Sequence, residues 1–234
     1  MRKFAKISAV LAAMVFALAF AGCKSDDDDD DEGNGTSSTK NILAGKTYYS
    51  IDFEKVDYTS ESNNEAKIRV GMFAFDSNGQ KVKFTGLEYN FKNGAVDENK
   101  DNIIESDELN YSVSGSTLTI KELGNLIATI KSDGSIDGMK ELKGNLYAFA
   151  KAKADSKELL AVAYIITVDG TACNLEQQYH NEEPFVLEGT VSGSTLKFTA
   201  ERKDGQTVTV SGKLSDKEIK IDDSPEGPIT LKRM

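Results

Sequence analysis

Residues 87–92, with the sequence LEYNFK, alternate strictly between apolar and polar side chains. Residues 196–200 (LKFTA) and 207–210 (TVTV) have the same period of two. This alternation is typical of antiparallel strands that turn one face toward a core and the other toward water. The sequence from Gly45 onward therefore predicts an all-β body.

Turn signals separate the predicted strands. Asn-Gly or Asp-Gly pairs occur at residues 78–79, 93–94, 133–134, 137–138, 169–170 and 204–205, and Ser-Gly-Ser occurs at 114–116 and 192–194. Asn, Asp and Gly tolerate the positive φ angles of tight hairpins. Short turns between successive strands predict an antiparallel meander.

Residues 159–168 (LLAVAYIITV) break the alternation because they are almost wholly apolar. Such a run is consistent with a strand buried on both faces. A short helix that begins at Asp155, with Glu158 three residues later as in a capping box, is the alternative.

The body contains a faint internal repeat. The sequence VSGSTL at 113–118 recurs at 191–196. An acidic segment at 97–108 has no counterpart in the second half of the chain. These observations predict two repeats, 42–141 and 142–234, with one loop insertion in the first. Chance similarity among hairpins rich in Ser, Gly and Thr is the alternative.

The N-terminus has the pattern of an export signal. A basic start is followed by a 15-residue apolar run at 7–21, interrupted only by Ser8, and then by Gly22-Cys23. The run is shorter than the roughly 20 residues that a membrane-spanning helix needs, and it suits a signal peptide. The end of the run resembles the lipobox of bacterial lipoproteins, with Phe20 where that family usually has an aliphatic residue.

The lipobox resemblance implies that residues 1–22 are removed and that Cys23 is acylated, which anchors the protein in a membrane. An ordinary signal peptide, cut near Gly22, is the alternative. Residues 23–40 contain six aspartates and Glu32, then mainly Gly, Asn, Ser and Thr. They have no apolar surface to bury and are expected to form a disordered tether.

The acidic run resembles those of Bacteroidetes and spirochaete lipoproteins, where such runs can accompany surface export. A solvated spacer is the alternative. Lys24 differs from the Asp that favours inner-membrane retention in enterobacterial lipoproteins. We therefore expect an outer-membrane location, on the periplasmic face or at the cell surface.

Charge and composition exclude several functions. The chain has a net charge of −10, and removal of the three basic side chains in residues 1–22 makes it −13. A surface this acidic is repelled by phosphate, so we expect no nucleic-acid partner. The chain has no Gly-x-Ser-x-Gly, phosphate-loop or His-Glu-x-x-His motif. We expect Cys173 to be a buried apolar residue, the single His180 to lie in an exposed loop, and the protein not to be an enzyme.

Residues 97–108 (DENKDNIIESDE) resemble the calcium loop of EF-hands. Asp97, Asn99 and Asp101 occupy the first, third and fifth places, which supply side-chain oxygens.

Ile103 falls at the seventh place, where a backbone carbonyl binds the ion, and Glu108 falls at the twelfth, the bidentate place. Asn102 stands where EF-hands have Gly, and strands are predicted on both sides instead of helices. The spacing predicts a calcium site, and an acidic solvated hairpin loop is the alternative.

Residues 41–234 resemble the lipocalin-like β-barrel domains of bacterial lipoproteins. Residues 43–48 (LAGKTY) would open the first strand, and hairpins such as 111–118 (YSVSGSTL) would follow it. Lipocalins usually open with Gly-x-Trp, whereas this chain has no Trp and Tyr48 lies three residues after Gly45. The resemblance implies an antiparallel meander barrel.

These observations lead to one main expectation about function. We expect a lipid-anchored, non-enzymatic cell-envelope protein of a diderm bacterium that binds a small apolar ligand or a protein partner. The alternative is a structural or adhesive surface lipoprotein whose barrel is solid and whose loops make its contacts.

Overall fold

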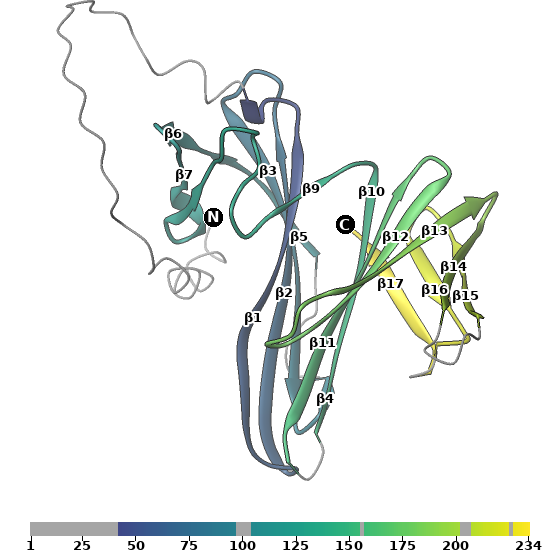
Figure 1. Ribbon diagram of the computed structural model, residues 1–234. Coiled ribbons are helices and arrows are strands. Elements are labelled where there is room, and N and C mark those ends of the chain that lie inside the picture. Colours follow the sequence, from purple (N-terminus) through teal and green to yellow (C-terminus); the bar gives the residue numbers. More distant parts are fainter. Residues whose placement is uncertain (1–41, 97–103, 155–156, 202–206, 225–226) are drawn as a thin grey trace, which may run out of the picture. The chain divides into compact units, whose positions relative to one another are not determined.

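The computed structural model describes residues 42–96, 104–154, 157–201, 207–224 and 227–234 (Figure 1). The strands run Thr47–Ser60 (β1), Asn63–Phe75 (β2), Lys81–Lys92 (β3), Ala95–Val96 (β4), Ile104–Asn110 (β5), Ser112–Ser114 (β6), Thr117–Ile120 (β7), Leu126–Thr129 (β8), Lys140–Leu142 (β9), Asn145–Ala154 (β10), Leu159–Asp169 (β11), Ala172–Tyr179 (β12), Phe185–Ser192 (β13), Thr195–Glu201 (β14), Thr207–Leu214 (β15), Glu218–Ile221 (β16) and Ile229–Arg233 (β17). A 3-10 helix, η3, covers Lys121–Leu123. The all-β prediction is confirmed.

The chain divides into two compact units. The first contains Met1–Lys46, Ala74–Lys83 and Glu108–Gly138, and the second contains Thr47–Phe73, Phe84–Asp107 and Met139–Met234.

The second unit contains a closed antiparallel barrel formed by β10 to β17. Each strand pairs with the next, and β17 closes the barrel by pairing Arg233 with Tyr147 and Lys232 with Ala148 of β10. Closure removes the exposed edges that an open sheet would leave. The predicted meander barrel is therefore present, and its strands occupy residues 145–233.

Strand β11 lies between two hydrophobic cores, which explains its almost wholly apolar sequence. Its odd-numbered residues face a core shared with β1, β2 and β3, and its even-numbered residues face the barrel interior. The first group is Leu159, Ala161, Ala163 and Ile165, and the second is Val162, Tyr164, Ile166 and Val168. The strand buried on both faces is confirmed, and the alternative helix is not found over Leu159–Asp169.

A second sheet packs one face against β10 and β11 in the same unit. Its strand order is β4-β3-β2-β1-β9, and β5 also pairs with β3. Leu87, Tyr89 and Phe91 are buried in the shared core, as the alternation of residues 87–92 predicts. The Tyr89 hydroxyl donates a hydrogen bond to the Ala148 carbonyl at 3.1 Å.

The opposite face of this sheet carries a charged network. Arg69 contacts the carboxylates of Glu54 at 2.8 Å and Glu88 at 2.9 Å, and Lys67 contacts the same two carboxylates at 3.0 and 3.1 Å. Burial acts to raise the pKa of Glu88, but hydrogen bonds from Arg69 and Asn90 and the charge of Lys67 outweigh it. The pKa of Glu88 therefore lies below its ordinary value.

The first unit contains the three-stranded sheet β6-β7-β8. Leu118 and Ile120 of β7 are fully buried. Phe75 and Tyr111 meet edge to face, with ring centroids 5.0 Å apart. These contacts give the unit an apolar core of its own.

The two VSGSTL sequences form matching hairpins. Residues 113–118 join β6 to β7, and residues 191–196 join β13 to β14. In each, the first residue pairs with the sixth and the second with the fifth. The turn glycines, Gly115 and Gly193, have φ angles of 57° and 58°. The two repeats at 42–141 and 142–234 stay a prediction, and this shared register is consistent with them.

Candidate functional site

The side chains that point into the barrel form one apolar core. Its buried members are Tyr147, Val162, Tyr164, Ile166, Val168, Cys173, Leu175, Leu196, Phe198, Ile219, Ile221, Ile229 and Leu231. Leu196, Phe198 and Leu231 have no exposed surface. Phe198 lies so close to Gly189 that a Cβ atom there would fall 2.5 Å from the ring. The barrel is therefore filled by its own side chains at this level.

Cys173 belongs to this core and is buried, as the sequence predicts. Burial raises the pKa of its thiol to about 11. The thiol is therefore protonated at neutral pH and is a weak nucleophile.

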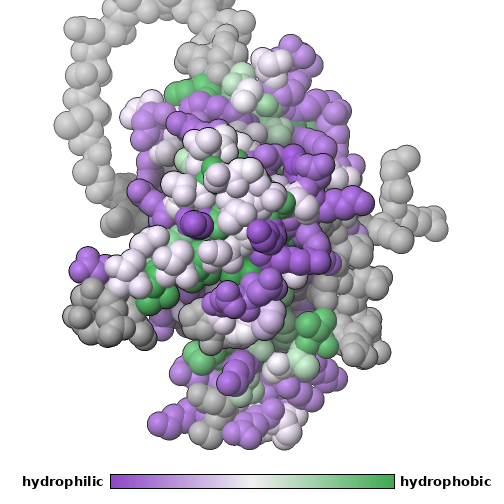
Figure 2. All heavy atoms as spheres, turned by 90° about the vertical axis from the view of Figure 1, so that its right-hand side faces the viewer, coloured by the Kyte–Doolittle hydropathy of each residue, from purple (hydrophilic) through white to green (hydrophobic). Residues whose placement is uncertain are grey.

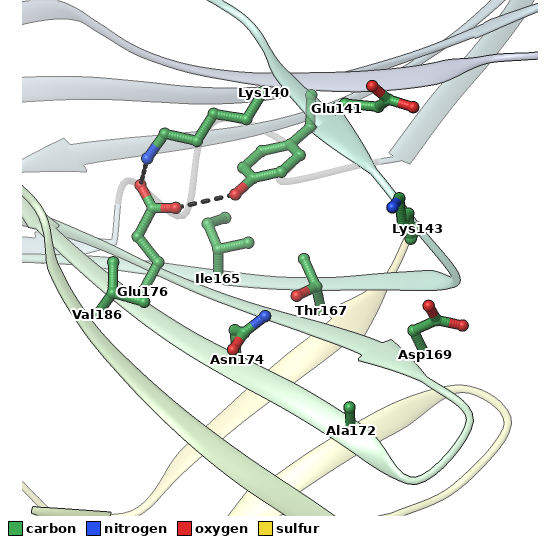
Figure 3. A pocket seen from close by; sticks show the side chains of 11 residues that line it. Lys140, Glu141, Lys143, Ile165, Thr167, Asp169, Ala172, Asn174, Glu176 and Val186 are labelled. Carbon is green, nitrogen blue, oxygen red and sulfur yellow. Dashed lines mark hydrogen bonds and ion pairs between the residues drawn. The ribbon is translucent and has the colours of Figure 1, made fainter.

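A groove of about 440 Å³ lies on the outer face of the barrel. Figure 3 shows Lys140, Glu141 and Lys143 along one side and Val186, Asn174 and Ala172 along the other. Ile165 and Thr167 of β11 lie between the two sides (Figure 3). The volume is within the range of small-molecule and peptide pockets, but the walls carry both signs of charge.

A buried carboxylate organises one end of the groove. Glu176 of β12 accepts a hydrogen bond from the Tyr49 hydroxyl at 2.9 Å and an ion-pair contact from the Lys140 ammonium at 2.6 Å. The Glu176 side chain is only 6% exposed, whereas that of Lys140 is 48% exposed. Burial, followed by the charge of Glu176 and the hydrogen bond to it, raises the pKa of Tyr49, so its hydroxyl stays protonated.

This carboxylate connects three strands from distant parts of the chain. Tyr49 lies on β1, Lys140 on β9 and Glu176 on β12, and Tyr49 is paired with Lys140 in the β1–β9 register. A buried carboxylate costs little free energy only when each of its oxygens has a hydrogen-bond or ion-pair partner. The network therefore fixes the position of β9 above the barrel.

Apolar surface is exposed beside the groove. Phe185 and Val186 on β13 are 54% and 51% exposed. On the face seen in Figure 2, green hydrophobic areas are small and separated by hydrophilic side chains. That face therefore carries no broad apolar surface among the residues coloured there.

The predicted calcium residues fall largely outside the described part of the chain. The residues outside it are Asp97, Asn99, Asp101 and Ile103. Glu108 is described and is an exposed residue of β5. Within the described residues, no group of three or more His, Cys, Asp or Glu side chains is placed to hold a metal ion. The calcium site stays a prediction.

Cys23 and its flanking residues also lie outside the described part of the chain. Across the residues whose structure is described, no helix has the length and apolar character needed to cross a membrane. The acylation of Cys23 stays a prediction.

His180 lies in the connection between β12 and β13 and is half-buried, whereas we expected an exposed residue. Its ring centroid is 5.7 Å from that of Phe53, and its Nδ1 is 3.0 Å from the Asn181 amide nitrogen. Its backbone N–H donates to the Ala161 carbonyl at 3.0 Å. These contacts give His180 a role in holding β1 against the barrel strands.

Comparisons of the chain with protein-family models, with curated proteins and with solved structures each found no match.

The sequence did not single out the residues that build the groove. Glu176 follows Asn174 as a polar residue that alternates with Cys173 and Leu175, which is the pattern of a solvent-facing strand position. Its burial depends on Tyr49 and Lys140, which are distant in the sequence. Two consecutive apolar residues, Phe185 and Val186, follow Pro184 without alternation, and this is the sequence signal that points to the region.

Proposed function

We propose that this protein is a lipid-anchored cell-envelope binding protein of a diderm bacterium, without enzymatic activity, and that it binds a protein partner on its outer surface. The filled interior of the barrel supports this proposal. A ligand inside would have to displace side chains such as Phe198 and Leu196, which have no exposed surface. Side chains in a close-packed protein interior cannot be displaced without a large cost in free energy.

The outer groove supports a role in binding more directly. It combines a buried, fully partnered Glu176 with exposed charged and apolar neighbours. A rigid scaffold that presents a few exposed groups is a common form of binding surface. Of the two kinds of ligand expected from the sequence, a protein partner bound at the outer surface is therefore better supported than a small apolar molecule inside the barrel.

We place the anchor at Cys23, as in bacterial lipoproteins, with residues 1–22 removed and residues 23–40 acting as the tether. The seven acidic side chains of residues 26–32 favour an extended tether and are repelled by an anionic membrane surface. The domain would thereby be held away from the outer membrane.

We also propose that the segment 97–108 binds calcium in a structural role. Its support is the spacing of Asp97, Asn99, Asp101 and Glu108, with Ile103 at the carbonyl position. Without an ion, the carboxylates of this segment repel one another.

A photocrosslinking experiment in the native host tests the binding function. A benzophenone amino acid is placed at Val186, beside the groove, and in a control chain at Thr209, an exposed residue of β15. We expect ultraviolet-dependent adducts with one protein species at Val186 and not at Thr209. Equal labelling at both positions, or saturable uptake of a fluorescent fatty acid by the purified protein, would contradict the proposal.

A further inference from the structure

Strand β9 has an unpaired edge. It is the last strand in the order β4-β3-β2-β1-β9, and no described strand other than β1 pairs with it. In the barrel, by contrast, the last strand β17 is flanked by both β16 and β10. An unpaired edge presents backbone N–H and C=O groups that can pair with another chain.

The groove lies along this edge. Lys140 and Glu141 are consecutive residues of β9, so their side chains point to opposite faces of the sheet. Both nevertheless line the groove (Figure 3). A cavity that contacts both faces of a strand borders its edge, so the backbone of β9 forms part of the wall.

The opposite side of the groove suits an extended segment. Ala172, Asn174 and Glu176 follow one another along the outward face of β12. From the first to the last of these residues, a strand advances about 13 Å at roughly 3.3 Å per residue. That length accommodates about four residues of an extended polypeptide.

The lining selects against other ligand classes. An apolar molecule would remove water from Lys143, Asp169 and Asn174 without replacing their hydrogen bonds. An ion of either sign would meet like charges, because lysine and carboxylate side chains both line the groove. A polypeptide backbone is neutral and both donates and accepts hydrogen bonds. It can therefore replace the hydrogen bonds of the polar lining without charge repulsion, and one of its apolar side chains can contact Val186.

We propose that the groove binds an extended polypeptide segment of a partner protein, which adds to β9 as a strand. This inference rests on the proposed function, because it specifies how the partner is bound. Main-chain hydrogen bonds to the edge of β9 would provide affinity, and contact with Val186 would provide side-chain selectivity. The ion pair with Glu176 holds the Lys140 ammonium down on the barrel.

The test uses the full chain in mild detergent and a phage-displayed library of random octapeptides. Enriched peptides are synthesised with a fluorescent label, and their affinity is measured by anisotropy. Val186→Asp and Ala172→Trp change exposed groove residues, and Thr209→Asp changes an exposed residue of β15 as a matched control. Circular dichroism melts show whether each variant folds.

We expect enriched peptides to lose about tenfold in affinity with either groove variant and to be unaffected by the control. N-methylation of alternate peptide residues should weaken binding about tenfold in only one of the two registers, because alternate residues of a strand direct their N–H groups to opposite sides. Hydrogen exchange at Lys140–Leu142 should slow when the peptide is bound.

Three results would overturn the inference: no peptide enriched above the background of an empty support, enriched peptides that bind the groove variants as well as the native chain, or no effect of N-methylation in either register. Crosslinking at Val186 in cells does not depend on strand addition. A positive crosslink with a negative peptide result would therefore remove this inference and leave the proposed function standing.

Discussion

Replacing Glu176 by Ala should destabilise the protein by about 2–3 kcal/mol. The Tyr49 hydroxyl is buried, and without Glu176 it loses its acceptor, which costs about 1–3 kcal/mol. The ion pair with Lys140 adds at most about 1 kcal/mol, because the lysine side chain is about half exposed to solvent.

Two further variants separate these contributions. Glu176→Gln keeps an oxygen that can accept from Tyr49 and removes only the charge, so it should cost about 1 kcal/mol or less. In the double variant with Tyr49→Phe, the buried hydroxyl is absent. The double variant should therefore lose less stability than the sum of Glu176→Ala and Tyr49→Phe.

The assay is equilibrium unfolding in urea, followed by far-ultraviolet circular dichroism at 25 °C. Free energies of unfolding are compared among variants whose dependence on urea is unchanged. If Glu176→Ala and Glu176→Gln cost the same, or if the single variants are additive with Tyr49→Phe, the buried hydrogen bond does not stabilise the fold as argued.

Four other predictions concern the anchor, the metal, pH and the barrel core. Cys23→Ala should release the protein from membranes or leave the signal peptide uncut, measured by detergent phase partition and mass spectrometry. Calorimetric titration with calcium should give heat with the native chain and none with an Asp97→Ala, Glu108→Ala double variant. The pKa of Glu88 is lowered in the folded protein, so the folded protein binds fewer protons at this site than the unfolded chain. The ionised Glu88 therefore adds to the free energy of unfolding above its ordinary pKa of 4.5, and this stabilisation is lost as the pH falls through the pKa of the folded state. Glu88→Gln should therefore flatten the loss of stability below about pH 4.5 in urea titrations. Phe198→Ala should cost about 3–5 kcal/mol in the same urea assay, because this ring is fully buried.

Each of these has a contradicting result. Mature native protein found wholly in the aqueous phase would exclude the anchor. Equal calcium heats in the native and double-variant chains would exclude the site. An unchanged acid profile after Glu88→Gln, or a loss below about 1 kcal/mol for Phe198→Ala, would contradict the network and the filled barrel respectively.

The strands could be predicted from the sequence because side-chain alternation is a local property. Leu87, Tyr89 and Phe91 are buried as the alternation predicts, and the Asn93-Gly94 turn has the two positive φ angles, 54° and 70°, that such a pair favours. Asn90, on the face expected to meet water, is also buried, and its amide nitrogen donates to the Glu88 carboxylate at 3.0 Å. The apolar run at 159–168 predicts a strand buried on both faces, and β11 has a core on each side. Which core each face meets could not be predicted, because that depends on strands far away in the sequence.

The groove could not be predicted for the same reason. Glu176 occupies an outward position on its strand, and nothing in its neighbours along the chain indicates that Tyr49 and Lys140 cover it. The sequence predicts a barrel over residues 41–234, whereas the strands of the closed barrel begin at Asn145 and end at Arg233. Hairpin signals occur in both halves, and closure is decided by long-range pairing such as that of β10 with β17.

The position of β11 between two cores has a consequence for how the second unit unfolds. If the barrel opens, β11 cannot keep Ile166 and Val168 inside it, and the same movement withdraws Ala163 and Ile165 from the sheet that packs on the other side. Opening of the barrel therefore also disrupts the core on the other side of β11, so the barrel core cannot unfold while the shared core stays intact. Native-state hydrogen exchange should therefore find the amides of β10 and β11 opening only with the whole unit, at the slowest rates in the chain.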